Sequence, residues 1–332
     1  MNSRLSAILE IAPTVVAMES EATWATFSPG QRTVLVVDGN SLFHRAWHAY
    51  ERSGMSNSAG RPVFGTYGFL ALLSGISDKV VPDAIVVGFD DQRGSTRKAR
   101  CQEYKATRGD KSPDLYVQMN DTHLALRELG VAVITPPGLE ADDVLGSVAA
   151  TAEQEGWRCV IATSDRDAFS LISATTTVLR LVSGLDNAVW MTPDVLVQTY
   201  GIRPEQYLDF AALRGDPSDN LAGVQGIGEK TAAKLLAGLG SLDSALDDLP
   251  MVATIAGPSV AKKLASPEAR TAIDRNRDIM SINRTIPVDL QEATLRSDAQ
   301  KVGAVLRKLE LPSLATRLTA ALCRTPAQTI SV

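Results

Sequence analysis

Pro137-Gly138-Leu139-Glu140-Ala141-Asp142-Asp143-Val144-Leu145 places three carboxylates within four residues. The stretch follows a short β-like run at 131–134 and opens a segment with the 3.6-residue apolar spacing of a helix. One acid at a helix start is ordinary, because it caps backbone amides and suits the positive end of the helix dipole. Three acids this close repel one another unless solvent or cations separate them. Taken alone, the stretch fits a helix cap and a metal site about equally well.

The same arrangement recurs three times along the chain. Apolar runs at 33–37, 84–89 and 159–164 end in Asp38, Asp90 and Asp165, and Asp167 lies two residues further on. Continuous apolar runs that alternate with helical segments are typical of buried parallel strands. Ligands of open parallel sheets bind beyond the carboxyl ends of the strands. We therefore expect four acid-bearing segments to meet at one edge of an α/β sheet.

Carboxylates without soft ligands indicate a hard divalent cation. Mg²⁺ takes oxygen ligands and keeps several waters, and two such ions about 4 Å apart can clamp a phosphodiester. The chain has three His and three Cys, none paired at zinc spacing. We predict Mg²⁺ or Mn²⁺, with nine candidate ligands: Asp38, Asp90, Glu140, Asp142, Asp143, Asp165, Asp167, Asp216 and Asp219.

Composition leaves DNA open as a partner. The formal net charge is −5, but the chain carries +4 once the nine candidate ligands, each worth −1, are set aside. Hydrophobic residues make up 45% of the 332 residues, enough for a large core. No apolar run approaches the roughly 18 residues of a membrane span, so we expect no membrane association. Three scattered cysteines suit a reducing cytosol.

The chain divides into four parts. Residues 1–32 are predicted to be a poorly ordered extension and residues 323–332 a tail. Residues 33–192 would form the α/β core, and residues 193–322 a helical region. Within the core, 93–111 is strongly basic, and we expect it to project from the core as a mobile segment because it is too polar to pack. Tyr104 and Lys105 put an aromatic beside a cation there, as nucleic-acid channels often do.

A glycine-rich turn at 223–228 precedes Lys230 and Lys234, which share one helix face. Glycines such as Gly226 and Gly228 let a backbone approach a ligand closely, and amides at a helix start favour phosphate. A tight structural turn would explain the glycines equally well. The turn becomes more specific because it directly follows Gly-Asp-Pro-Ser-Asp-Asn at 215–220.

Taken together and in this order, the motifs resemble the bacterial 5′ nucleases, that is, flap endonucleases and the 5′-nuclease domain of DNA polymerase I. The resemblance covers roughly residues 33–290 and rests on seven motifs: Val-Val-Asp-Gly-Asn (36–40), Phe-Asp (89–90), Tyr-Lys (104–105), Glu-Ala-Asp-Asp (140–143), Ser-Asp-Arg-Asp (164–167), Gly-Asp-Pro-Ser-Asp-Asn (215–220) and Gly-Val-Gln-Gly-Ile-Gly-Glu-Lys (223–230). Every acidic position is filled, so we expect an active enzyme. No region of polymerase length follows, which favours the stand-alone form.

The resemblance implies a PIN-like, mostly parallel sheet flanked by helices, with a helical arch at about 93–120. It assigns Asp38, Asp90, Glu140 and Asp142 to one metal, Asp165, Asp167, Asp216 and Asp219 to a second, and Asp143 between them. Lys105 and Arg97 would approach the scissile phosphate from the arch, and Arg45 would add a phosphate contact. The DNA-contacting residues would be His44, Tyr104, Arg108, Gly226, Gly228, Lys230 and Lys234, with His44 and Tyr104 stacking on an unpaired base.

The resemblance also implies a helix–two-turn–helix at about 213–237 that grips duplex DNA. In relatives this motif holds K⁺ through backbone carbonyls, here those of Leu213, Arg214, Ala222, Val224 and Ile227. The expected activity is metal-dependent 5′-3′ exonuclease and flap cleavage on flaps, nicks and 5′ ends, with RNA primer strands as further substrates. The expected protein is a monomer in the cytoplasm, associated with the nucleoid. Two alternatives stay open: a PIN-type ribonuclease, and a structure-binding protein without turnover.

Overall fold

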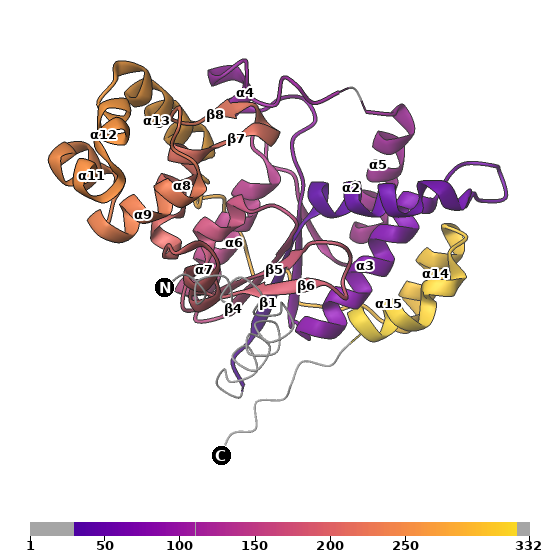
Figure 1. The fold of residues 1–332 in the computed structure, drawn as a ribbon. Helices are drawn as coiled ribbons and strands as arrows, with labels where there is room; N and C mark the ends of the chain where they lie inside the picture. The colour runs from indigo at the N-terminus through magenta and orange to yellow at the C-terminus, as the bar shows by residue number, and fades with distance from the viewer. Residues whose placement is uncertain (1–29, 110, 324–332) are drawn as a thin grey trace, which may run out of the picture.

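Six strands form one central sheet in the order β3-β2-β1-β4-β5-β6 (Figure 1). The computed structural model describes residues 30–109 and 111–323. All neighbouring strands are parallel except β5 and β6, which are antiparallel. The strands are β1 (Thr33–Asp38), β2 (Ala84–Gly88), β3 (Ala132–Ile134), β4 (Arg158–Thr163), β5 (Thr176–Leu181) and β6 (Ala188–Met191). The predicted α/β class with a mostly parallel sheet is confirmed.

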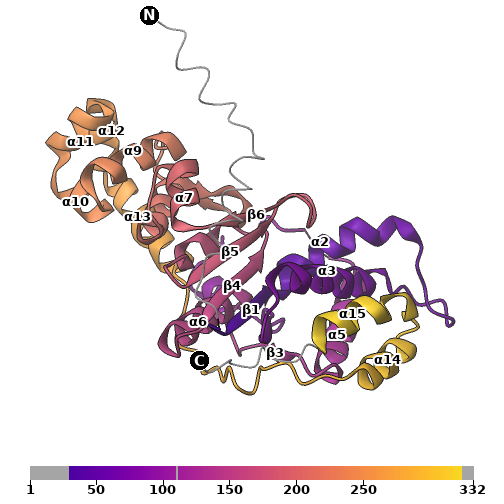
Figure 2. The same ribbon diagram turned by 90° about the horizontal axis from the view of Figure 1, so that it is seen from below.

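Helices cover both faces of the sheet (Figure 2). One face packs against α6 (Ala141–Gln154), and the other packs against α2 (Gly39–Tyr50), α3 (Phe64–Val80) and α5 (Pro113–Glu128). Strand β1 shows why both layers are needed. Val34 and Val36 belong to the core on the α6 side, and Leu35 and Val37 to the core on the other side. Successive side chains point to opposite faces of a strand. A continuous apolar run therefore has to be covered by helices on both faces of the sheet.

Seven helices follow the sheet and extend to one side of it. They are α7 (Pro193–Tyr200), α8 (Tyr207–Arg214), α9 (Glu229–Leu239), α10 (Leu242–Asp247), α11 (Leu249–Ala256), α12 (Pro258–Leu264) and α13 (Pro267–Met280). A two-stranded ribbon, β7 (Gly215–Asp216) and β8 (Leu221–Ala222), lies between α8 and α9. The aromatic rings of Phe169, Tyr207 and Phe210 belong to the same core as α6, so this region is continuous with the sheet layer.

Short 3₁₀ turns connect several of these elements. They are η1 (Glu51–Ser53), η2 (Asp167–Leu171), η3 (Pro204–Gln206), η4 (Pro217–Asp219) and η5 (Pro312–Leu314).

The last two helices return to the helix layer that covers the sheet. Helices α14 (Ala299–Lys308) and α15 (Ala315–Leu322) lie beside α3, away from α9 to α13 (Figures 1 and 2). The chain comes back through hydrogen bonds to β2, where Ile85 N donates to Ala293 O (3.3 Å) and Leu295 N donates to Asp83 O (3.0 Å). Sequence reasoning grouped 193–322 as one helical region. Helical periodicity does not indicate which surface an apolar helix face covers. The packing of the last two helices beside α3 could therefore not be predicted from the sequence.

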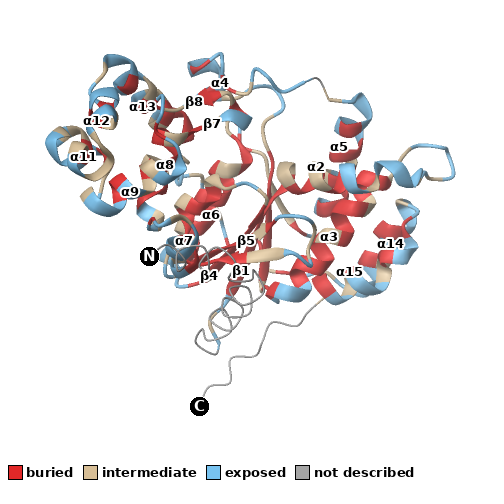
Figure 3. Cartoon of the chain, viewed as in Figure 1, coloured by how far each residue is buried: buried red, intermediate tan, exposed pale blue. Residues whose placement is uncertain are grey.

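The basic segment after β2 differs from its prediction. Residues 93–111 contain a short helix, α4 (Thr96–Arg100), and Arg97, Cys101 and Tyr104 are buried. Figure 3 shows buried and exposed positions alternating along the ribbon around α4. The expectation that this segment is too polar to pack is therefore wrong for these three positions. Cations can be buried when carboxylates pair with them, and the acidic helix start at residue 140 supplies those partners.

Two predicted segments fall mainly outside the described residues. Of the predicted extension, residues 1–29 lie outside them, and β1 begins at Thr33. Of the predicted tail, residues 324–332 lie outside them. Within the described ranges, no helix is both long and apolar enough to cross a bilayer.

Leu318 tests whether α15 belongs to the core. Its side chain has no exposed surface and lies in the cluster that includes α3. Leu318→Ala should lower the free energy of unfolding by about 2–5 kcal/mol, because it removes buried methyl groups and leaves a cavity. Urea unfolding measures this, with the exposed Thr316→Ala as the matched control. A loss below about 0.5 kcal/mol would show that α15 contributes little to the core.

Candidate active site

Four acids from separate segments line one cavity of about 160 Å³: Asp38, Asp90, Asp142 and Asp165. Asp38 ends β1, Asp90 follows β2, Asp165 follows β4, and Asp142 lies in the first turn of α6. Strands β1, β2 and β4 are adjacent and parallel, so their carboxyl ends lie at one edge. The order in which successive strands are added to the sheet reverses between β1 and β4. Open α/β sheets bind their ligands at such a reversal. The predicted edge site is present.

Asp38 and Asp90 are oriented by hydrogen bonds from the surrounding backbone and side chains. Asp38 accepts from Ser41 N (2.9 Å) and from Thr163 Oγ1 (2.7 Å). Asp90 accepts from Asn40 Nδ2 (2.9 Å) and from Ala141 N (2.8 Å). Sequence reasoning missed Asn40 and Thr163 as supporting residues, although Asn40 was part of a quoted motif. These bonds fix the carboxylates and leave them at the cavity wall.

The cavity acids are electrostatically strained. Burial raises the pKa of Asp38 to about 7, even though its hydrogen bonds from Ser41 and Thr163 act in the opposite direction. Burial, followed by the nearby charges of Asp38 and Asp165, raises the pKa of Asp142 well above its usual range. Bound cations would relieve this cost, because they favour the ionised carboxylates.

A second acid group adjoins the first through Asp165. Asp167 lies in η2, and Asp216 and Asp219 come from the β7–β8 ribbon and its connecting turn. Burial and then the charges of Asp165, Asp216 and Asp219 raise the pKa of Asp167 well above its usual range. Its Oδ1 is buried without a hydrogen-bond partner. A buried oxygen with no partner is a feature that a cation or its water would satisfy.

This donor set fits hydrated Mg²⁺ or Mn²⁺. All donors are carboxylate oxygens, the ligands that hard divalent cations prefer. Across residues 30–109 and 111–323, no three Asp, Glu, His or Cys side chains are grouped closely enough to hold an ion directly. Asp38, Asp90, Asp142 and Asp165 would hold one group of ions, and Asp167, Asp216 and Asp219 would complete the other.

Lys105 is one of three cationic residues in the wall of the acidic cavity, with Arg108 and Lys111. Its Nζ lies 2.8 Å from Glu140 Oε2, and its backbone N–H donates to Asp219 O (2.9 Å). Burial lowers its pKa, but the charges of Glu140 and Asp219 outweigh burial and raise it. The residue adopts a left-handed backbone with φ of 57°, which is uncommon outside glycine. The turn therefore directs Lys105 into the cavity as a permanently charged ammonium.

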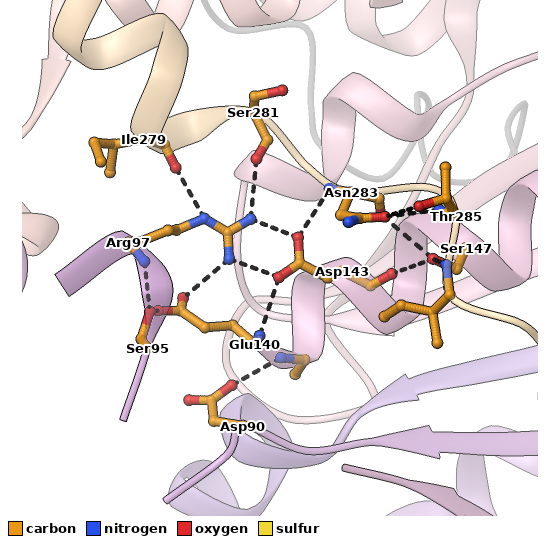
Figure 4. Close-up of polar contacts among 12 residues, drawn as sticks. Asp90, Ser95, Arg97, Glu140, Asp143, Ser147, Ile279, Ser281, Asn283 and Thr285 are labelled. Atoms are coloured by element: carbon orange, nitrogen blue, oxygen red, sulfur yellow. Dashed lines mark hydrogen bonds and ion pairs between the residues drawn. The ribbon is translucent and has the colours of Figure 1, made fainter. Parts of the chain in front are cut away.

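Arg97 lies elsewhere, in a buried clamp with Asp143 (Figure 4). Its guanidinium contacts both Asp143 oxygens, at 2.8 and 2.6 Å, and donates to the carbonyls of Ile279 (2.9 Å) and Ser281 (3.0 Å). The side chains of Arg97 and Asp143 are 6% and 1% exposed. All five N–H groups of an arginine are donors, and most are satisfied here. The geometry gives Arg97 a structural position and not the predicted place at a scissile phosphate.

Asp143 has no free oxygen for a metal in this arrangement. Besides Arg97, it accepts from Glu140 N (3.0 Å) and from Asn283 N (2.8 Å). The clamp thus joins three parts of the chain: α4, the start of α6, and the segment after α13 (Figure 4). The motif Glu-Ala-Asp-Asp could not separate the roles of its acids, because residues one apart on a helix face different directions.

Glu140 and Tyr104 also differ from their predicted roles. Glu140 is 3% exposed and accepts from Ser95 Oγ (2.5 Å), Tyr104 OH (2.9 Å) and Lys105 Nζ. Burial raises its pKa, but the charge and hydrogen bond of Lys105 bring it below the usual range. Tyr104 is 4% exposed, so its ring is not available for stacking on a base in this state. A metal would have to replace Lys105 or Tyr104 at Glu140.

His44 and Arg108 lie in the wall of the acidic cavity, and Arg45 lies in the wall of the cavity next to it. Lys111 also lines the acidic cavity, and Arg108 forms an ion pair with Asp219. Burial and the charge of Lys111 lower the pKa of His44 to about 4, so its imidazole is neutral at pH 7. Lys111 was counted in the basic stretch but not assigned a role by sequence reasoning.

The predicted helix–two-turn–helix corresponds to α8, the β7–β8 ribbon and α9. A Cβ on Gly223 would lie 2.3 Å from the Arg214 carbonyl, so only glycine fits between the two turns. Gly226 has φ of 79°, and Gly228 caps α9. Lys230 and Lys234 are exposed on α9. The turn therefore presents the two lysines to solvent from a rigid base.

Three of the five carbonyls predicted to bind K⁺ already accept hydrogen bonds. Leu213 O accepts from Val224 N, and Val224 O accepts from Ile227 N, both at 2.9 Å. Ala222 O accepts from Arg275 Nη2 (2.6 Å) and Asn276 Nδ2 (3.0 Å). A guanidinium at Ala222 opposes a second cation on the same oxygen. Arg275 and Asn276 carried no signal in the sequence.

Fold and site together define an α/β protein with a carboxylate-lined cavity at the carboxyl ends of its parallel strands. The family described as 5′-3′ exonuclease, N-terminal resolvase-like domain, matches residues 33–201, and the 5′-3′ exonuclease, C-terminal SAM fold, matches residues 202–302. The chain belongs to the 5′-3′ exonuclease family.

Relatives and solved structures agree with this assignment. DNA polymerase I of Mycobacterium tuberculosis (strain ATCC 25618 / H37Rv) is 38% identical over 289 residues, 86% of this chain and 31% of that protein. The thermostable DNA polymerase I of Thermus aquaticus is 37% identical over 290 residues, 87% of this chain and 33% of that protein. The chain thus spans about a third of the length of these relatives.

Solved structures show the same fold at low identity. The T5 D15 protein co-crystallised with metal ions superposes with a TM-score of 0.62 at 16% identity, covering 88% of this chain and 100% of that one. Human GEN1 in complex with Holliday junction DNA gives 0.57 at 17% identity, covering 88% and 71%.

Replacing Arg97 distinguishes a structural clamp from a phosphate contact. Arg97→Ala should lower the free energy of unfolding by about 3–5 kcal/mol, because it leaves Asp143 as an uncompensated buried charge. Arg93→Ala is the matched control, since Arg93 is exposed and its pair with Asp91 should contribute at most about 1 kcal/mol. Chemical unfolding at pH 7 measures both. Unchanged stability with lost cleavage would restore the phosphate role for Arg97.

Proposed function

We propose that this protein hydrolyses DNA phosphodiester bonds near 5′ ends and flap junctions, as a divalent-metal-dependent 5′-3′ exonuclease and flap endonuclease. The observation that carries the proposal is the meeting of acids from three parallel strands and one helix start around a cavity that also contains Lys105. Carboxylates alone would repel a phosphodiester. Carboxylates with cations and a nearby lysine form a place where a phosphate can be held and attacked.

We further propose Mg²⁺ or Mn²⁺ as the catalytic cations. When bound, they would activate a water and stabilise charge on the attacking and leaving oxygens. Asp38, Asp90, Asp142 and Asp165 would anchor one ion through its waters, and Asp167, Asp216 and Asp219 a second. Glu140 would join the first group once Lys105 turns toward substrate. Asp143 serves by holding Arg97, which keeps the start of α6 in place.

The cations around the cavity would orient the substrate strand. Lys105 would place its ammonium against the scissile phosphate, where it offsets the charge that develops during attack. Arg108 would exchange Asp219 for a phosphate oxygen, and His44, neutral at pH 7, would contact the strand without adding charge. These groups act on the backbone and not on base edges, so cleavage should follow DNA structure and not sequence.

The exposed lysines of α9 would grip the duplex next to the cut. Lys230 and Lys234 are four residues apart on one face, and Gly228 leaves open space for a phosphate at the helix start, where the Lys263 side chain lies against Gly226. Potassium at this turn stays a proposal, through the carbonyls of Leu213, Arg214, Val224 and Ile227. Ala222 would join them only if Arg275 moved away.

Structures with this fold support DNA and metal ions as ligands. The T5 D15 flap endonuclease was solved with DNA and metal ions, T5 5′-exonuclease with zinc, and the Rad2 catalytic core with a DNA substrate. The sequence relatives are bacterial DNA polymerases. We propose replication and repair in the cytoplasm as the setting, with flaps, nicks and RNA primer strands as substrates.

Cleavage of end-labelled flap, nicked and blunt duplexes with Mg²⁺, Mn²⁺ or EDTA tests the proposed function. Cleavage should require the cation and should be lost in Asp165→Asn. Asp165 is exposed and makes few internal contacts, so this variant should stay folded, as circular dichroism would check. Matched RNA flaps are included. Faster cleavage of RNA than DNA would favour a ribonuclease, and binding without cleavage would favour a structure-binding protein.

Lys105→Ala tests the role of the lysine in the chemical step. Loss of one preorganised electrostatic contact should slow single-turnover cleavage of a saturated flap roughly 10²–10³-fold. Binding should weaken only modestly, because Arg108 and Lys111 still attract the strand. The exposed Lys79→Ala controls for loss of one positive charge. A rate constant within about threefold of the unmodified protein would reject the catalytic role of Lys105.

A further inference from the structure

A second and larger cavity adjoins the carboxylate cavity. Its volume is about 770 Å³, and the two cavities share Ser41, His44, Arg108 and Lys111 as wall residues. Four segments build it: helix α2, the basic segment before α5, Ser164 directly after β4, and the turn between β5 and β6 that includes Ser183. The resemblance to 5′ nucleases assigned single residues to this open cavity, but it did not assign the cavity as a binding site.

The new cavity has a basic wall without acids, whereas its neighbour combines four aspartates with three cations. Arg45, Arg108 and Lys111 line it with two histidines, and no Asp or Glu is among its described wall residues. The carboxylate cavity next to it has four aspartates in its wall. One open surface therefore changes from acidic to basic across the shared residues.

Two of these cations have no acidic partner among the described residues. Arg45 Nη1 donates to Val182 O (3.0 Å), and its Nε is buried without any hydrogen-bond partner. Lys111 Nζ lies 2.6 Å from His44 Nε2, a neutral nitrogen. Buried donors without partners cost free energy, and cations grouped together repel. An anion with several oxygens would satisfy the donors and reduce the repulsion.

Phosphate is the anion that best fits this wall. Arginine and lysine together form strong charge-assisted bonds to phosphate oxygens. A phosphomonoester has three terminal oxygens and about −1.5 to −2 charge at pH 7, against −1 for a diester. This cavity is a basic space that continues from the carboxylates, so it is placed to receive the end of a strand whose scissile bond lies at Lys105.

We propose that this cavity binds the 5′-terminal phosphate of the strand being cleaved. The inference rests on the proposed function and adds a specific end group to it. Phosphorylated 5′ ends would be seated with their first phosphodiester bonds near the carboxylates. An end that carries only a hydroxyl would lose these contacts.

The test compares nicked duplexes with a 5′-phosphate or a 5′-hydroxyl on the downstream strand, using the full chain. Binding is measured in EDTA, where no cleavage occurs, and single-turnover cleavage is measured with Mg²⁺. The phosphorylated end should bind about tenfold more tightly. Arg45→Gln and Lys111→Gln should each reduce this preference to below about threefold. The exposed Arg52→Gln, just beyond α2, should preserve it.

Each outcome bears on the proposal separately from the proposed nuclease function. Equal binding of the two ends by the unmodified protein would overturn it. Variants that weaken both ends to the same extent would also overturn it, because they would indicate contacts to internal phosphodiesters. A phosphate preference in EDTA without any Mg²⁺-dependent cleavage would retain the cavity and reject the nuclease.

Discussion

Repulsion between carboxylates is the constraint on which this structure depends. Parallel strands deliver Asp38, Asp90 and Asp165 to one edge, and α6 adds Asp142. Such a cluster is unstable in a buried place unless cations balance it. The chain supplies part of the balance itself, through Lys105 at Glu140 and Arg108 at Asp219. The remaining charge is what makes the site suited to divalent ions, so stability and chemistry are set by the same groups.

The internal cations have two kinds of role, which their surroundings decide. Arg97 is enclosed by Asp143 and two carbonyls. Its loss would leave these buried acceptors without the guanidinium that pairs with them. Lys105 and Arg108 each hold one carboxylate while lining the open cavity. A side chain of the second kind can exchange its carboxylate for a phosphate when a strand arrives, because both partners are anionic oxygens. The carboxylates that pair with Lys105 and Arg108 thus occupy the positions that the phosphates of a bound strand would take.

Much of the fold and part of the site followed from the sequence. Apolar runs that end in Asp predicted the parallel strands and the edge where they meet, since strand polarity fixes both. The clamp of Arg97 was not predictable, because its partners Ile279 and Ser281 lie about 180 residues away and contribute backbone carbonyls, which have no residue signature. Burial of Tyr104 was not predictable for a similar reason. Its neighbours in the chain are polar, and the carboxylate that accepts the hydrogen bond from its hydroxyl lies at the start of α6.

The return of the last helices to α3 has a consequence for the design of recombinant fragments of this chain. The recognised family region stops at residue 302, inside α14. A fragment cut there would keep every acid of the site, yet it would remove α15 and uncover the apolar side of α3. Exposed apolar surface of that kind favours aggregation. A recombinant fragment designed on the acidic motifs alone would therefore aggregate, although it would contain all the acids of the site. A fragment that keeps the core covered has to extend beyond Leu322.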